Sequence, residues 1–151
     1  MPNWCSNQAT FAVQDDNLHE LIRLKQAFEE GSPFNFYLPV PEHDSDTLDE
    51  YIKRWGTKWD LDEYDDTITI NKNSFSLVFQ TAWTPPIPFY EELNRIGIDV
   101  HAYYLEPGCD FCGHYVDGVD HYFDGLNLDD PDIADICFAM GYETFEEDED
   151  E

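Results

Sequence analysis

The sequence predicts an α+β domain built on one antiparallel sheet. Segments that alternate between apolar and polar residues, which is typical of half-buried strands, are interrupted by segments with helical periodicity. Their order is strand, helix, strand, strand, helix, strand, the β-α-β-β-α-β arrangement of a ferredoxin-like sandwich. Hydrophobic residues make up 42% and aromatic residues 16% of the 151 residues, which is enough for one core. We therefore expect one domain over residues 1–145 and a disordered acidic tail at 146–151.

The first part of the chain is predicted to form a strand, a helix and an extended crossing. Residues 4–13 alternate and should form a half-buried strand. A helix should follow, capped by Asp15 or Asp16 and ended by Gly31. Segment 34–41 is apolar but contains two prolines, so we expect it to be extended.

Residues 41–66 are predicted to be an insertion that contains a short amphipathic helix. Apolar residues within 45–55 recur at i, i+3, i+4 and i+7, and the last of them is Trp55. Gly56 should end this helix and turn the chain, so that Trp59 packs against the same core as Trp55.

The central part of the chain is predicted to contribute three strands and the second helix of the sandwich. Strands are expected at 67–71, 74–83 and 99–106, where apolar and polar residues alternate. Two prolines should open a helix near 87–96. The two long helices are then expected to cover one face of the sheet.

An additional hairpin and a last helix are predicted after the sandwich. Residues 114–123 flank an Asp-Gly pair, which suits a type I′ turn. This hairpin should extend the sheet or cross its open face. Asp130 and Pro131 should start the last helix, and Gly141 should end it.

Acidic residues dominate the composition and restrict the possible partners. The chain has 34 Asp and Glu against seven Lys and Arg, a net charge of −27. This charge opposes direct binding to nucleic acid and to anionic membranes, both of which require basic groups. Basic protein surfaces and metal cations are the favourable partners. Because carboxylates concentrate in 41–66 and 109–151, we expect both segments to face solvent and the near-neutral 67–108 to be buried.

Segments that would direct the chain to a membrane or out of the cell are not recognisable. No apolar run reaches the roughly 20 residues that span a bilayer, and the first residues do not resemble a signal peptide. Four cysteines in such a chain suggest a reducing compartment and free thiols. We therefore expect a cytoplasmic protein, either a monomer or a small homo-oligomer.

The carboxylates of the two acidic segments are the candidate partner-binding residues. They are Asp60, Asp62, Glu63, Asp65, Asp66, Asp117, Asp120, Asp124, Asp129, Asp130, Asp132 and Asp135. The four tryptophans allow two interpretations, a shared aromatic core or a partly exposed platform that anchors a partner. They are Trp4, Trp55, Trp59 and Trp83.

A Cys-x-x-Cys motif invites an alternative interpretation as a metal-dependent or thiol-dependent enzyme. It would be centred on Cys109, Cys112 and His114. Zinc usually requires four ligands, and the sequence has no second cysteine pair, so we predict no cofactor. The carboxylates of 120–132 lack the spacing of an EF-hand. Three strand histidines next to tyrosines are expected to be structural; they are His101, His114 and His121.

Four separated blocks resemble a known family. They read MPNWCSN at 1–7, WGTKWD at 55–60, FQTAWTPPIP at 79–88 and YLEPG at 104–108. Together they resemble the YubB-type ferredoxin-like domain family, small proteins that phages and plasmids carry. The resemblance covers about residues 1–123. Members of that family do not share the pair Cys109 and Cys112. The resemblance implies the same fold and a mobile-element origin, hence action inside a bacterial cell, and it brings no established activity.

These observations favour a non-enzymatic, highly acidic binding protein of a phage or other mobile element. We expect it to engage a basic host protein surface. One specific form of this hypothesis is DNA mimicry, in which carboxylates occupy the basic groove of a host nuclease or another defence protein. The competing interpretation is that the charge only maintains solubility.

Overall fold

The structure is a computed structural model that describes residues 4–39, 54–57 and 68–141. Six strands form one antiparallel sheet in the order β2-β3-β1-β4-β5-β6. The first four have the order of a ferredoxin-like sheet, and the hairpin β5–β6 extends it beyond β4. The strands are β1 (Trp4–Ala12), β2 (Ile68–Asn71), β3 (Ser74–Ala82), β4 (Asp99–Glu106), β5 (Phe111–Val116) and β6 (Val119–Asp124).

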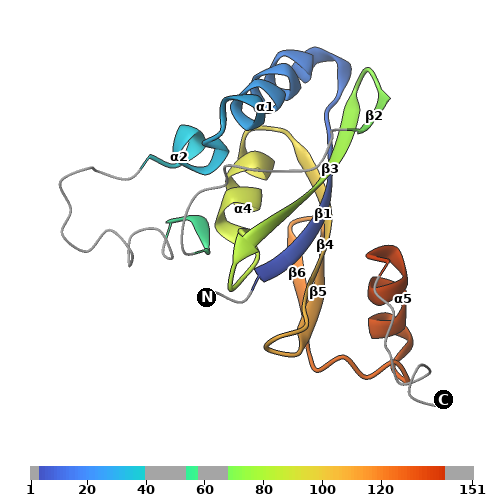
Figure 1. Cartoon of the computed structure of the whole chain (residues 1–151). Coiled ribbons are helices and arrows are strands. Elements are labelled where there is room, and N and C mark those ends of the chain that lie inside the picture. Colours follow the sequence, from blue (N-terminus) through green and yellow to red (C-terminus); the bar gives the residue numbers. More distant parts are fainter. Residues whose placement is uncertain (1–3, 40–53, 58–67, 142–151) are drawn as a thin grey trace, which may run out of the picture.

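Helices lie on both faces of this sheet, but unequally (Figure 1). Three of them cover one face and α5 lies against the other, near the hairpin. The second face is therefore covered only in part, and we call it the open face. The helices are α1 (Leu18–Glu30), α2 (Pro33–Tyr37), α4 (Ile87–Arg95) and α5 (Pro131–Ala139).

The main core lies between the sheet and α1, α2 and α4, and it is rich in aromatic rings. Phe11, on the central strand β1, is fully buried. Its ring centroid lies 5.8 Å from that of Phe28, 5.4 Å from that of Phe75 and 6.5 Å from that of Tyr90. These tilted arrangements are the ones that ring quadrupoles favour. Alternation along β1, β3 and β4 thus places one row of side chains from each of these strands in this core.

A second, smaller cluster lies under α5 on the open face. It joins residues of β4 and β5 to the apolar side of the helix. Its buried members are Leu105, Cys112, Ile133, Ile136 and Cys137. Because α5 has few other contacts with the sheet, this cluster fixes where the helix and its carboxylates lie.

Residues 54–57 are fixed against the main core. The Trp55 side chain is only 2% exposed, and the Thr57 hydroxyl donates a 2.7 Å hydrogen bond to the backbone carbonyl at the end of β3. A Cβ atom at Gly56 would lie 2.5 Å from Cδ of Pro88, so only glycine fits there. The expected inward packing of Trp55 is confirmed. The rest of the expected helix at 45–55, Trp59 and the tail at 146–151 lie outside the described residues.

Most predicted elements are present close to their expected bounds. The periodicity of the sequence correctly predicts β2, β3, α4 and β4. The hairpin turns at Asp117 and Gly118, which both have positive φ angles as a type I′ turn requires. It extends the sheet rather than crossing its open face. Asp130 caps α5 by accepting a 2.9 Å hydrogen bond from the backbone N–H of Asp132.

The prediction of an extended segment at 34–41 is wrong, because Pro33–Tyr37 form α2. Pro33 occupies the first helical turn, where its fixed φ angle and missing N–H are compatible with a helix. Phe34 is fully buried, with its ring centroid 4.8 Å from that of Phe89 and 6.0 Å from that of Trp55. Burial of the Phe34 ring favours the helical conformation. The two prolines later in the segment had suggested an extended one instead.

The predicted cap of α1 is also wrong. Asp15 and Asp16 lie in a 3₁₀ turn, and α1 begins only at Leu18. Asn17, at the N-cap position, instead donates two 3.1 Å hydrogen bonds to the carbonyls that end α4. Asp15 accepts a 2.8 Å hydrogen bond from the side chain of Asn73. These polar groups link neighbouring elements rather than satisfy the helix end.

The predicted alternation of the third strand ends one residue early. β3 stops at Ala82, and Trp83 has a φ angle of 76°, which is rare for a bulky residue. Trp83 is therefore turned out of the strand pattern, and 40% of it is exposed.

One tyrosine ring ties the added hairpin to the ferredoxin-like sheet. Tyr104 on β4 lies opposite Gly113 on β5, and its ring occupies the space that a side chain at Gly113 would need. An added Cβ would lie 2.1 Å from the Cζ and hydroxyl oxygen of Tyr104. Across β5, the Tyr104 hydroxyl donates a 2.6 Å hydrogen bond to Asp120 on β6. One side chain thus spans three strands.

We expect the substitution Gly113→Ala to lower the free energy of unfolding by roughly 1–3 kcal/mol, since the methyl group would overpack the Tyr104 ring. Urea unfolding monitored by circular dichroism measures the loss. In a Tyr104→Ala background the same change should be nearly neutral, because the ring is gone. An equal loss in both backgrounds would show that the ring does not fill this space.

Candidate functional site

Carboxylates concentrate on the hairpin β5–β6 and on α5. Residues 109–141 include eight aspartates and no Lys or Arg. We call seven of them, all predicted as partner-binding residues, the acidic edge: Asp117, Asp120, Asp124, Asp129, Asp130, Asp132 and Asp135. All are exposed except Asp130, which is half-buried. Arg23 pairs with Glu20 on α1, and Arg95 pairs with Glu92 on α4.

Some of these aspartates also have a local structural role. Asp130 and Asp132 lie at the start of α5, where a carboxylate interacts favourably with the helix dipole. Asp117 occupies a turn position that needs a positive φ angle, which Asp tolerates. Asp120 accepts the hydroxyl hydrogen bond of Tyr104. The edge is therefore held in place by defined contacts and is not a mobile tail.

The remaining five carboxylates of the predicted set lie outside the described residues. They are Asp60, Asp62, Glu63, Asp65 and Asp66.

The tryptophans divide between the two predicted roles. Trp55 is buried in the main core, whereas Trp4 is 39% and Trp83 40% exposed. Trp4 pairs in the sheet with Ala82, the residue before Trp83. The burial of Trp55 agrees with the shared-core interpretation. Trp4, at the start of β1, and Trp83, just after β3, are partly exposed, and a role for them as a partner-binding platform stays a prediction.

The residues of the alternative enzyme site lie in different environments. Cys112 is fully buried in the cluster under α5, and this burial raises the pKa of its thiol to about 12. Cys109 is exposed in the turn before β5. The backbone N–H of Cys109 donates a hydrogen bond to the buried carboxylate of Glu106. His114 packs against other rings. Within the described part of the chain, no group of three His, Cys, Asp or Glu side chains is placed to hold a metal ion.

A cluster of histidines on the open face was not predicted as a site. Nε2 of His114 on β5 lies 2.7 Å from Nε2 of His101 on β4. The His114 ring stacks on that of Tyr103, with centroids 4.6 Å apart and an interplanar angle of 10°. His121 on β6 pairs with His114 across the hairpin, with ring centroids 6.3 Å apart. The equal distance of His114 and His121 from the Asp-Gly turn was the sequence signal for this pair.

The short contact between His101 and His114 requires that at least one ring is neutral. One Nε2 must donate its proton and the other must accept it, so the two rings adopt complementary tautomers. Partial burial, together with His101 and His121, lowers the pKa of His114 below its usual value of 6.5. At neutral pH the cluster is therefore a polar aromatic surface in which His114 is uncharged.

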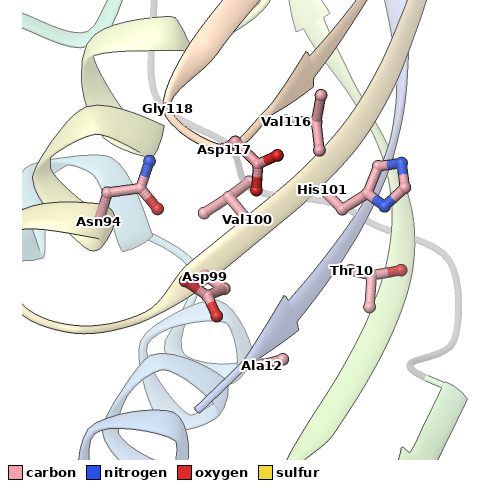
Figure 2. A pocket seen from close by; sticks show the side chains of 9 residues that line it. All are labelled: Thr10, Ala12, Asn94, Asp99, Val100, His101, Val116, Asp117 and Gly118. Carbon is pink, nitrogen blue, oxygen red and sulfur yellow. The ribbon is translucent and has the colours of Figure 1, made fainter.

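Two hollows flank the histidine cluster. The first, about 350 Å³, lies between the open face and α5 and is lined mainly by Tyr103, His114, His121, Phe123, Asp132 and Asp135. The second, about 590 Å³, lies at the start of β4. Figure 2 shows Asp99 and His101 of β4, Asn94 of α4 and Asp117 of the hairpin turn around it. His101 lines one hollow and its partner His114 lines the other.

We expect stability to fall on acidification in a way that depends on His114. Because its pKa is lowered in the folded chain, the unfolded chain takes up the proton more readily once the pH falls below about 6.5. The folded state thus loses stability between about pH 7 and pH 5. Urea unfolding at these pH values should show a smaller loss for His114→Gln than for the wild type. His19→Gln, which alters an exposed histidine next to Glu20, should retain the full loss; equal losses for all three would contradict the expectation.

We also expect the four thiols to differ sharply in reactivity. In the folded protein a disulfide reagent such as Ellman's reagent should modify Cys109 quickly, because it is exposed, and should leave Cys5, Cys112 and Cys137 intact, because they are buried. Absorbance then reports about one thiol per chain. Cys109→Ser should abolish the fast phase and Cys112→Ser should retain it. Rapid modification of Cys112 would show that the cluster under α5 opens.

No described helix is both long and apolar enough to cross a bilayer.

Comparison with known proteins identifies the domain. A family model described as the ferredoxin-like domain in Api92-like protein matches residues 54–150, which is more than half of the chain. This confirms the expected ferredoxin-like family, although the description names Api92-like and not YubB-type proteins. No curated protein and no solved structure matches the chain.

Proposed function

We propose that this chain, which belongs to the family of ferredoxin-like domains in Api92-like proteins, is a non-enzymatic binding protein that engages a basic protein surface. The observation that carries the proposal is the composition of residues 109–141, where eight aspartates occur without a single Lys or Arg. Seven of them form the acidic edge, which the hairpin and α5 hold on a folded surface.

The fixed position of this charge favours a role in recognition. A charge density of one sign accelerates the encounter with a partner of opposite charge and makes association sensitive to salt. Tyr104 and the cluster under α5 hold the carboxylates in one arrangement, so little conformational freedom is lost on binding. Phe138 on α5 is 88% exposed and lies one turn after Asp135. An exposed aromatic ring among carboxylates is suited to act as an apolar anchor.

We further propose that the partner is a host protein that binds nucleic acid. The resemblance to YubB-type proteins of phages and plasmids suggests a mobile-element origin, for which a host nuclease or defence protein is a natural target. The aspartates of β6 and α5 would then take the place of phosphates in its basic groove, as in DNA mimicry. The enzyme hypothesis has less support, since the Cys112 thiol is buried and the pKa of that thiol is high.

We expect the immobilised protein to retain a basic partner from a nuclease-treated bacterial lysate in about 50 mM salt and to release it in about 500 mM salt. Mass spectrometry identifies the retained protein. The triple variant Asp117→Asn, Asp124→Asn, Asp129→Asn should slow association with the purified partner by about tenfold or more at low salt. If DNA mimicry applies, duplex DNA should compete for the same partner.

A matched variant separates specific recognition from bulk charge. Asp16→Asn, Glu29→Gln and Glu30→Gln remove the same number of exposed charges from the opposite part of the molecule. This control should bind almost as fast as the wild type. The proposal would be contradicted if the two triple variants had equal effects, or if no protein were retained at low salt and released at high salt. The acidic surface would then serve only to maintain solubility.

A further inference from the structure

We propose that the hollow between α5 and the open face is a receptor for one guanidinium or ammonium group, supplied by an Arg or Lys side chain of the partner. The inference rests on the proposed function and names the group that is recognised. It concerns one pocket of about 350 Å³ and not the acidic edge as a whole.

The walls of this pocket come from four elements that lie next to one another. Tyr103, His114 and His121 occupy paired positions on β4, β5 and β6 and form an aromatic floor. Asp132 and Asp135, three residues apart on α5, form the facing wall. Side chains with this spacing project from the same side of a helix. The pocket therefore presents aromatic rings on one side and two carboxylates on the other.

This combination suits an organic cation. Aromatic faces attract a cation through the ring quadrupole, and a guanidinium group can also stack on them. The two carboxylates can accept charge-assisted hydrogen bonds from the same group. No Lys or Arg is among the residues that line the pocket. The neutral state that His114 retains at pH 7 removes the nearest source of repulsion.

The geometry favours an organic cation over a metal ion. Two nitrogen ligands of a tetrahedral zinc ion lie about 3.3 Å apart, since each Zn–N bond is about 2.0–2.1 Å. The Nε2 atoms of His101 and His114 are 2.7 Å apart, which is a hydrogen-bond distance. These two nitrogens therefore form a hydrogen bond with each other and are not spaced as zinc ligands. The pocket next to them is lined by aromatic rings and carboxylates.

Binding of the cation should depend on pH. The groups that face His114 are His101 and Tyr103 on β4, His121 on β6, and the two carboxylates of α5. Acidification protonates His114, and its positive charge then opposes a guanidinium group. Because the pKa of His114 is lowered, affinity should hold at pH 7.5 and fall once the pH drops below about 6.5.

The test uses a small probe, so that it does not depend on finding the partner. N-acetyl-arginine amide is titrated into the full-length protein at pH 7.5, and the histidine ring resonances are followed by NMR. We expect saturable shifts at His114 and His121. The uncharged analogue N-acetyl-citrulline amide should cause none. Asp132→Asn with Asp135→Asn should weaken binding about tenfold or more. The matched pair Asp117→Asn with Asp124→Asn should change it by less than about twofold.

Three outcomes would overturn the inference. They are the absence of saturable shifts, equal shifts from the citrulline probe, and equal affinity in a folded Asp132→Asn, Asp135→Asn variant. Stoichiometric zinc binding that shifts the same histidines would also overturn it, in favour of a metal site. Retention of a basic partner without probe binding rejects only this pocket. Probe binding without any retained partner leaves the pocket in place and rejects the proposed function.

Discussion

Repulsion among carboxylates is the constraint that the whole structure must overcome. A net charge of −27 on 151 residues opposes compaction. The opposing contribution comes from tightly packed rings, since Phe11, Phe28, Phe34, Phe79 and Phe89 are all 2% exposed or less. Each large aromatic side chain removes much apolar surface from water. A core built so largely from rings allows a small domain to carry this charge on its exterior.

The charge is placed where the fold can tolerate it. Strand β6 lies at one edge of the sheet, and its aspartates Asp120 and Asp124 also discourage pairing with another chain. Its position depends on the absence of a side chain at Gly113, over which the Tyr104 ring reaches Asp120. The acidic edge and the histidine cluster therefore share one support, the register between β4, β5 and β6.

Elements with a strong local signal could be predicted from the sequence, and elements decided by distant contacts could not. Asp117 and Gly118 encode the hairpin turn, so the hairpin was predicted from local rules, and the same turn implies the pairing of His114 with His121. The approach of His101 to His114 depends instead on the turn between β4 and β5, where Asp110 has a positive φ angle and Glu106 accepts two backbone N–H groups. No simple motif describes that turn. Similarly, α2 depends on the burial of Phe34 against Phe89, which is far away in the sequence.

The fixed segment at 54–57 changes how the long connection between α2 and β2 is closed. Gly56 packs against Pro88, and Thr57 is hydrogen-bonded to the end of β3. The chain between α2 and β2 is therefore divided into two shorter segments, each with both ends fixed. The entropy lost on closing a chain segment grows with its length, so a fixed midpoint stabilises the closed chain. A side chain at Gly56, or loss of the Thr57 hydroxyl, would remove one of the two contacts that hold this midpoint on the sheet.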